Sequence, residues 1–170
     1  SIKLSKLSHS ISNFERIGDY GVNILKIKRR MHQNKVHFTQ DANRELEIMS
    51  RAVQEITEKA IDAFIKDDAK LAAEIEPLEQ VINNLKEELR ARHSKRLQDN
   101  ECTIENGMLF FDIINSFERI ADHCSNLAVC MIELSNRSYQ THTYLKGVKS
   151  HSNKGFMEMF EEYLLKYRIG

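Results

Sequence analysis

The segment FERIADHCSN at residues 117–126 has a counterpart near the start of the chain, FERIGDYGVN at residues 14–23. Extended by one residue at each end, the two segments are identical at six of twelve positions, at an offset of 103 residues. So wide a spacing suggests a duplicated supersecondary unit rather than a solenoid repeat. Each copy carries a Glu-x-x-x-Asp pair, Glu15/Asp19 and Glu118/Asp122, whose carboxylates would share one helix face.

The composition indicates an all-α protein. Gly occurs six times and Pro only once, at Pro77, so the residues that usually punctuate β structure are scarce. Helix-favouring residues such as Leu, Ala, Glu and Lys fill most of the chain. With 170 residues, the chain can bury a hydrophobic core and corresponds to one domain, or to one domain with a tail.

Apolar periodicity predicts four long helices and one short helix near the end of the chain. The predicted ranges are 2–33, 40–66, 68–97, 108–135 and 154–167. Pro77 predicts a break in the third helix near Glu76, because proline interrupts helical hydrogen bonding. Short connectors favour an antiparallel up-down bundle. We therefore expect a helical bundle over residues 1–138 and a tail with a short helix over residues 139–170.

The first helix is expected to bury one apolar stripe, formed by residues at three- and four-residue spacing. These residues are Ile11, Phe14, Gly18, Val22 and Leu25. Because the first residue is not Met and lies already in a helical pattern, the sequence suggests a piece of a longer protein.

Three other polar residues are assigned to the surface. Asp41 and Glu45 share the four-residue spacing of the repeated motif, but at the start of the second helix they are typical of solvated charges. His93 is expected to be a surface or capping group of the third helix.

The second Glu-x-x-x-Asp pair is the stronger candidate for a site. Two carboxylates one turn apart cost a helix roughly 0.2–0.5 kcal/mol, and more beside a buried stripe, so a positive group should offset them. An antiparallel neighbour would place the third helix opposite this pair. The resulting candidate ligands are Glu118, Asp122, Glu79, Asn83, Glu76 and, if the helix turns it inward, His123. Oxygen ligands favour Mg, Mn or Fe; a salt-bridged network without metal is the alternative. Arg16 and Arg119 are expected to be structural ion-pair partners.

Charge and cysteine content restrict the class of protein. Lys and Arg together equal Asp and Glu at 25 each, which gives no overall attraction to nucleic acid. Residues 1–37 are nevertheless basic, which predicts either a solvated helix end or a patch for a membrane surface or phosphate. Three cysteines without a C-x-x-C pair indicate a reducing, cytoplasmic setting and small core residues. The longest apolar runs are too short to span a bilayer.

At these residues the chain resembles the PhoU family, whose members are built from two three-helix repeats with an E(D)xxxD motif on the second and third helices. It is most similar to the PhoU-like C-terminal domain of bacterial sodium/phosphate cotransporters. The resemblance covers about residues 8–135, and the tail lies outside it. The segments that carry it are EPLE at 76–79, LRARH at 89–93, RL at 96–97, EC at 101–102 and FERIADHCSN at 117–126.

The resemblance implies one complete three-helix repeat, preceded by the third helix of another repeat. It implies iron or zinc at Glu118 and Asp122 together with Glu79, and a regulatory rather than enzymatic function in phosphate uptake. The sequence departs from the family pattern at Asn83, where an acid is usual. The upstream partner helix of Glu15 and Asp19 is absent, so these residues are either orphaned or share a region with the second motif.

The implied partners are a membrane-embedded transporter domain or phosphate-signalling proteins, on the cytoplasmic side of the bacterial inner membrane. A homodimer is possible through the face that upstream helices would cover. A metal-free helical scaffold is the alternative function. A di-metal carboxylate enzyme of the ferritin-like class is disfavoured, because none of the seven His has a Glu three residues before it.

Overall fold

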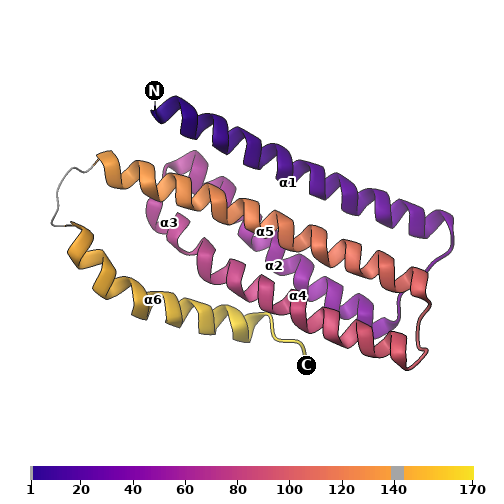
Figure 1. The fold of residues 1–170 in the computed structure, drawn as a ribbon. Helices are drawn as coiled ribbons and strands as arrows, with labels where there is room; N and C mark the ends of the chain where they lie inside the picture. The colour runs from indigo at the N-terminus through magenta and orange to yellow at the C-terminus, as the bar shows by residue number, and fades with distance from the viewer. Residues whose placement is uncertain (1, 139–143) are drawn as a thin grey trace.

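The computed structural model describes residues 2–138 and 144–170 (Figure 1). These residues form helices and the turns between them, without a strand. The helices are α1 (Ile2–Gln33), α2 (Gln40–Lys66), α3 (Ala69–Ala73), α4 (Ile75–Gln98), α5 (Ile104–Ser138) and α6 (Tyr144–Lys166). The expected all-α bundle with a C-terminal helix is confirmed. The predicted boundary between bundle and tail, at 138/139, adjoins residues that lie outside the described ranges.

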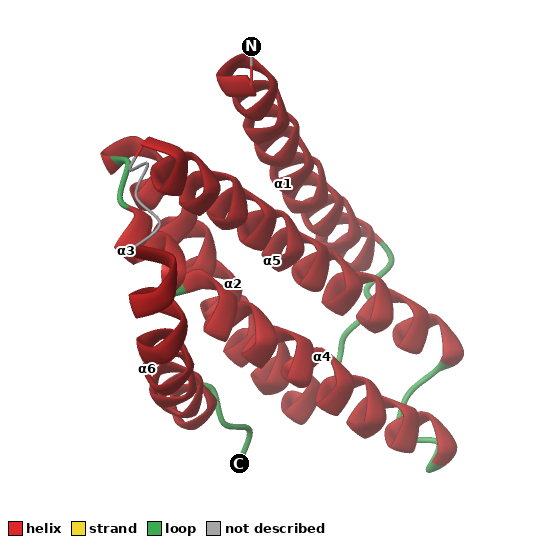
Figure 2. Ribbon diagram, turned by 60° about the vertical axis from the view of Figure 1, so that its left-hand side comes forward, coloured by secondary structure: helices red, strands yellow, loops and turns green. Residues whose placement is uncertain are grey.

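The long helices run alternately in opposite directions, as Figure 1 shows. Helix α5 packs against α1, α2, α3 and α4, and α6 lies along α4. Helix α1 lies on the outer side of α5, away from α4 (Figures 1 and 2). Within the described ranges, no helix combines the length and apolar character needed to cross a lipid bilayer.

The ends of α1 and α2 agree with the predicted ranges. Helix α2 begins after Thr39, whose hydroxyl accepts from the backbone N–H of Ala42 at 3.2 Å. It ends at Asp67, which adopts a left-handed conformation with φ of 51°. The break in the third predicted helix falls at Glu74, and Pro77 lies in the first turn of α4, where its missing N–H costs little.

Helix α5 begins at Ile104, four residues before the predicted start. The hydroxyl of Thr103 accepts from the backbone N–H of Asn106 at 3.1 Å, which caps the first turn. Gly107, predicted to be in a loop, is buried inside this helix. A Cβ atom at this position would lie 2.8 Å from the side chain of Leu97, so a larger residue here would force that side chain to shift.

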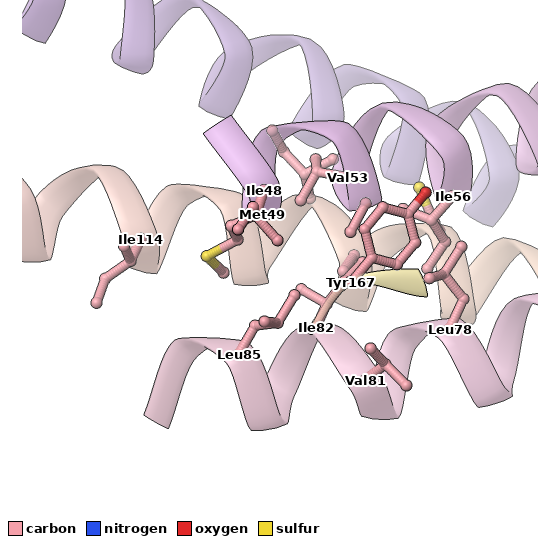
Figure 3. Close-up of a cluster of buried hydrophobic side chains, with 14 of the residues drawn as sticks. Ile48, Met49, Val53, Ile56, Leu78, Val81, Ile82, Leu85, Ile114 and Tyr167 are labelled. Carbon is pink, nitrogen blue, oxygen red and sulfur yellow. The ribbon is translucent and has the colours of Figure 1, made fainter. Parts of the chain in front are cut away.

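The core lies between α2, α4 and α5, and the side chain of Tyr167 enters it from beyond the end of α6 (Figure 3). Its labelled members are Ile48, Met49, Val53, Ile56, Leu78, Val81, Ile82, Leu85, Ile114 and Tyr167. Full burial of each such aliphatic side chain stabilises the fold by roughly 1.5–3 kcal/mol relative to an exposed one.

The predicted buried stripe of α1 was wrong at four of its five positions; only Phe14 is half-buried, and its ring packs edge-on against Phe64 of α2 with centroids 5.1 Å apart. Ile11, Val22 and Leu25 are 54%, 50% and 69% exposed, respectively. The face that meets α5 is a different and more polar one. Its buried or half-buried members are Ser10, Asn13, Ile17, Tyr20, Ile24, Ile27 and Met31. Helix α1 carries apolar residues on two faces, and most of the predicted stripe is exposed instead of packed on another helix.

A buried ion pair joins α2 to α4. Arg96 donates to both carboxylate oxygens of Glu45, at 3.0 and 2.7 Å, and both side chains are almost inaccessible to solvent. Arg96 also donates to Nδ1 of His93 at 3.1 Å, and the imidazole stacks on Phe110 with ring centroids 4.0 Å apart. Burial, and then the charge of Arg96, lower the pKa of His93 to about 4, so this ring is neutral. The predicted surface positions of Glu45 and His93 were therefore wrong.

We expect Glu45→Ala to destabilise the fold by about 3–5 kcal/mol, because it leaves the Arg96 guanidinium buried without its counter-ion. Urea unfolding followed by circular dichroism measures this loss. Glu47→Ala, at an exposed position of the same helix, is the matched control and should change stability by about 0.5 kcal/mol or less. Equal losses in the two variants would contradict this account of the pair.

Candidate metal centre

Acidic side chains from α4 and α5 meet at the edge of the core. The two helices are antiparallel, and the register places Lys86 opposite Glu118, with 3.3 Å between the ammonium and the carboxylate. One turn along, Asp122 reaches Glu79, and beyond them Ser125 donates to Glu76 at 2.6 Å. The structure thus brings together four of the predicted acidic ligands.

Glu79 is the most buried carboxylate of this group, at 8% exposed. Burial raises the pKa of Glu79 to about 7, helped by the charges of Glu76 and Asp122 and a hydrogen bond with Asp122. The amide of Asn83 donates to Glu79 at 2.6 Å and opposes this rise only in part. Close to neutral pH, Glu79 therefore holds a proton that a carboxylate in water would have lost.

Few positively charged side chains pair with these four carboxylates. Burial, and then the charge of Asp122, raise the pKa of Glu118 in spite of the ion pair with Lys86. Asp122 is 3.4 Å from Nη1 of Arg119, which confirms Arg119 as a structural ion-pair partner. Among the described residues, Glu79 accepts a hydrogen bond from the amide of Asn83 and takes part in no ion pair. The cluster thus has an excess of acidic groups at its most buried point.

One oxygen of this cluster lacks a partner. Oδ1 of Asn83 is buried and accepts no hydrogen bond, while the Nδ2 of the same amide donates to Glu79. Carboxylate and amide carbonyl oxygens are the ligands that hard cations prefer, so this group of oxygens suits such an ion. In the described part of the chain, however, no three His, Cys, Asp or Glu side chains already converge on one point. An incoming ion would therefore have to reorient these side chains.

His123 faces α1 rather than α4. Its Nδ1 lies 2.9 Å from Oδ1 of Asn13, whose amide Nδ2 donates to the backbone oxygen of His9. Because Asn13 Oδ1 is an acceptor, the proton of the imidazole sits on Nδ1 and leaves a lone pair on Nε2. Nε2 is buried and has no partner. Burial, and then the charge of Arg119, lower the pKa of His123, which keeps the ring neutral.

Glu15 and Asp19, the first copy of the motif, are exposed on α1 and are not joined to the second copy. Helix α1 nevertheless packs on α5 at the second motif, where the Tyr20 ring stacks on His123 at 5.9 Å. The hydroxyl of Tyr20 accepts from Nε of Arg119 at 3.3 Å. The two motifs therefore share a region, but only the second one forms a cluster of acidic side chains.

Sequence reasoning missed Lys86, Ser125 and Tyr20. Lys86 and Ser125 could have been found from the register, which sets position 86 opposite Glu118 and extends the pairing one turn past Asp122. Tyr20 carried no such signal, because the face of α1 that meets α5 was assigned incorrectly.

Glu79 predicts a pH dependence for the metal-free protein. The pKa of this acid is higher in the folded than in the unfolded chain, so its contribution to stability is lost as pH rises from about 4.5 to about 7. Glu79→Gln removes that loss. We expect the variant to gain roughly 1–3 kcal/mol over the wild type between pH 5 and pH 8.

Urea unfolding in the presence of a chelator, at both pH values, measures this gain. Glu87→Gln, at an exposed position of α4, is the control and should show the same difference from the wild type at pH 5 and pH 8. A pH-independent effect of Glu79→Gln would contradict the assignment.

Comparison with known proteins identifies the family. The model of the PhoU domain matches residues 46–131, half of the chain, which spans α3, α4 and most of α2 and α5. A curated relative, the phosphate-specific transport system accessory protein PhoU homolog 1 of Thermotoga maritima, is 27% identical over 143 residues, 83% of this chain. The chain spans about 60% of that relative's length. No solved structure matches. The chain therefore belongs to the PhoU family.

Proposed function

We propose that this chain is a metal-binding regulatory domain in phosphate uptake, with no catalytic activity of its own. The observation that carries the proposal is the buried carboxylate Glu79, crowded by Glu76 and Asp122 and lying next to the unpartnered oxygen of Asn83. A cation would allow these carboxylates to ionise together, which supports a site for a divalent or trivalent ion.

The residues that would hold the ion are Glu79, Asp122, Glu118 and Asn83, with Glu76 beside them. Their oxygen donors suit Mg, Mn or Fe, and zinc stays a candidate through the family resemblance. The bound ion would supply positive charge and open coordination positions for an anion such as phosphate. His123 would take part only if its free Nε2 were redirected, because it now lies against α1. Glu15 and Asp19 would need a second acidic helix beside them.

The partners are proposed by analogy with the Thermotoga relative, whose name describes an accessory protein of a phosphate-specific transport system. We propose that this chain acts with a transporter domain of the sodium/phosphate cotransporter type, or with phosphate-signalling proteins, at the cytoplasmic side of the bacterial inner membrane. The basic segment from Lys26 to Arg30, exposed except for Ile27, would suit that location.

A metal-free helical scaffold is the second candidate. It is favoured by the contacts that three of the carboxylates already make: Lys86 with Glu118, Arg119 with Asp122 and Ser125 with Glu76. Only Glu79 depends on an amide and on its own proton. The two functions therefore differ in whether an added metal binds at Glu79.

Metal titration separates these functions. We expect wild-type protein stripped with chelator to bind Mn²⁺ or Fe²⁺ in calorimetry and to unfold at higher temperature with metal present. Glu79→Gln/Asp122→Asn should weaken binding at least tenfold. Glu15→Gln/Asp19→Asn, in the exposed copy of the motif, is the matched control and should bind as the wild type does. Absence of binding by the wild type would favour the scaffold.

Lys86 offers a second test of the same site. Its ammonium neutralises Glu118 at 3.3 Å, so an incoming cation must compete with it. We expect Lys86→Met to raise the affinity for Mn²⁺ several-fold, because the side-chain volume is kept while the competing charge is removed. Lys95→Met, near the exposed end of the same helix, should leave the affinity unchanged. Weaker binding by Lys86→Met would contradict the competition.

A further inference from the structure

The contact between α1 and α5 lies at the second acidic motif, and α1 supplies an aromatic residue to it. Tyr20 stands directly after Asp19 in the first copy of the motif, at the position that His123 holds in the second copy. The two rings stack with centroids 5.9 Å apart. Nδ1 of the same His123 lies 2.9 Å from Oδ1 of Asn13, a buried residue of α1. These contacts hold the Tyr20 ring beside the turn of α5 that carries Asp122.

The guanidinium of Arg119 is shared between Tyr20 and Asp122. Its Nε donates to the hydroxyl of Tyr20 at 3.3 Å, and its Nη1 lies 3.4 Å from Oδ2 of Asp122. Its Cζ also lies over the Tyr20 ring, 5.8 Å from the centroid, as in a cation–π contact. Both polar distances are longer than the roughly 2.7–3.2 Å of a well-formed N–H···O hydrogen bond. Neither acceptor therefore holds the guanidinium alone.

The share of Arg119 that Asp122 receives matters for the candidate metal centre, because Asp122 is one of its ligands. A cation and the guanidinium compete for the same carboxylate. The side chains of Arg119 and Asp122 are 50% and 30% exposed, so water and salt weaken their ion pair. A second acceptor for the guanidinium shifts the competition further toward the cation, and the hydroxyl of Tyr20 is that acceptor.

We propose that Tyr20 of α1 is a positioning residue of the metal centre: by binding Arg119, it keeps the carboxylate of Asp122 available to a cation. This role rests on the proposed function and extends the site to α1, whose own acidic pair is exposed. The coupling is reciprocal. When Asp122 turns to a cation, Tyr20 is the acceptor that remains within reach of Arg119 among the described residues, so metal binding strengthens this contact between α1 and α5.

Metal titration of the full chain, stripped with chelator and at low ionic strength, tests this role. We expect Tyr20→Phe to weaken Mn²⁺ binding about twofold to fivefold, the range that a partly exposed ion pair supports, because Arg119 is then left to Asp122. In an Arg119→Met background, Tyr20→Phe should have no effect, since the competing group is gone. A residue that only stabilised the packing of α1 would weaken binding in both backgrounds.

Two control variants separate the role of Tyr20 from general effects on α1. Asn23→Ala removes another hydrogen bond between α1 and α5, to the hydroxyl of Ser116 at 3.0 Å, and should bind Mn²⁺ as the wild type does. Arg16, the exposed counterpart of Arg119 in the first copy of the motif, provides the charge control. In an Arg16→Met background, Tyr20→Phe should still weaken binding.

NMR of the metal-free chain gives a readout that does not depend on metal. We expect the Nε–H proton of Arg119 to exchange with water at least twofold faster in Tyr20→Phe than in the wild type, and more slowly than wild type in Asp122→Ala. Equal exchange in Tyr20→Phe and wild type would overturn the proposal.

The titration distinguishes failure of this role from failure of the proposed function. Unchanged or tighter Mn²⁺ binding by Tyr20→Phe would overturn the role of Tyr20 and leave the metal centre standing. A wild type that binds no metal would overturn both.

Discussion

Helix α5 contacts α1, α2, α3 and α4, so almost every part of the bundle depends on how this one helix packs. The same helix provides fully buried apolar residues, among them Phe110, Ile114 and Leu127, and the acidic pair Glu118 and Asp122. The two carboxylates consequently lie at the rim of a close-packed core and are only partly exposed to solvent. This constraint is the reason that burial is the largest cause of the raised pKa of Glu118, as it is for Glu79 on the facing helix.

Two groups of buried charge show opposite arrangements. At one end of α4, Arg96 satisfies both oxygens of Glu45, and His93 and Phe110 enclose the guanidinium. Removal of either partner of this ion pair would leave a buried charge unpaired, which suits a purely structural role. In the first half of the same helix, Glu79 pairs with no cation among the described residues, and burial raises its pKa to about 7. Such an arrangement lowers the stability of the fold, and a carboxylate with so perturbed a pKa is a candidate for a functional site.

The fold could be predicted from the sequence to a large extent, because helix ends depend on local signals such as the cap at Thr39 and the restraint at Pro77. The pairing of α4 with α5 followed from a short connection, and it places Lys86 opposite Glu118. The buried face of α1 could not be predicted in this way, since apolar residues occupy two faces and only packing selects between them. Glu45 looked solvated because its partner, Arg96, is 51 residues away in sequence. How closely the carboxylates of α4 and α5 approach one another depends on side-chain packing, which the apolar periodicity of a sequence does not report.

The bend between α4 and α5 is short, yet it is tied to the interior. Arg96 donates a hydrogen bond to Nδ1 of His93, so the proton of this neutral ring lies on Nε2. Nε2 lies 3.7 Å from the sulfur of Cys102. Asn106 donates to the backbone oxygen of His37, which attaches the same bend to the connection between α1 and α2. Surface turns of this length usually accept added residues. This one would not, so sequence insertions among family members with the same arrangement should be rare between residues 99 and 106.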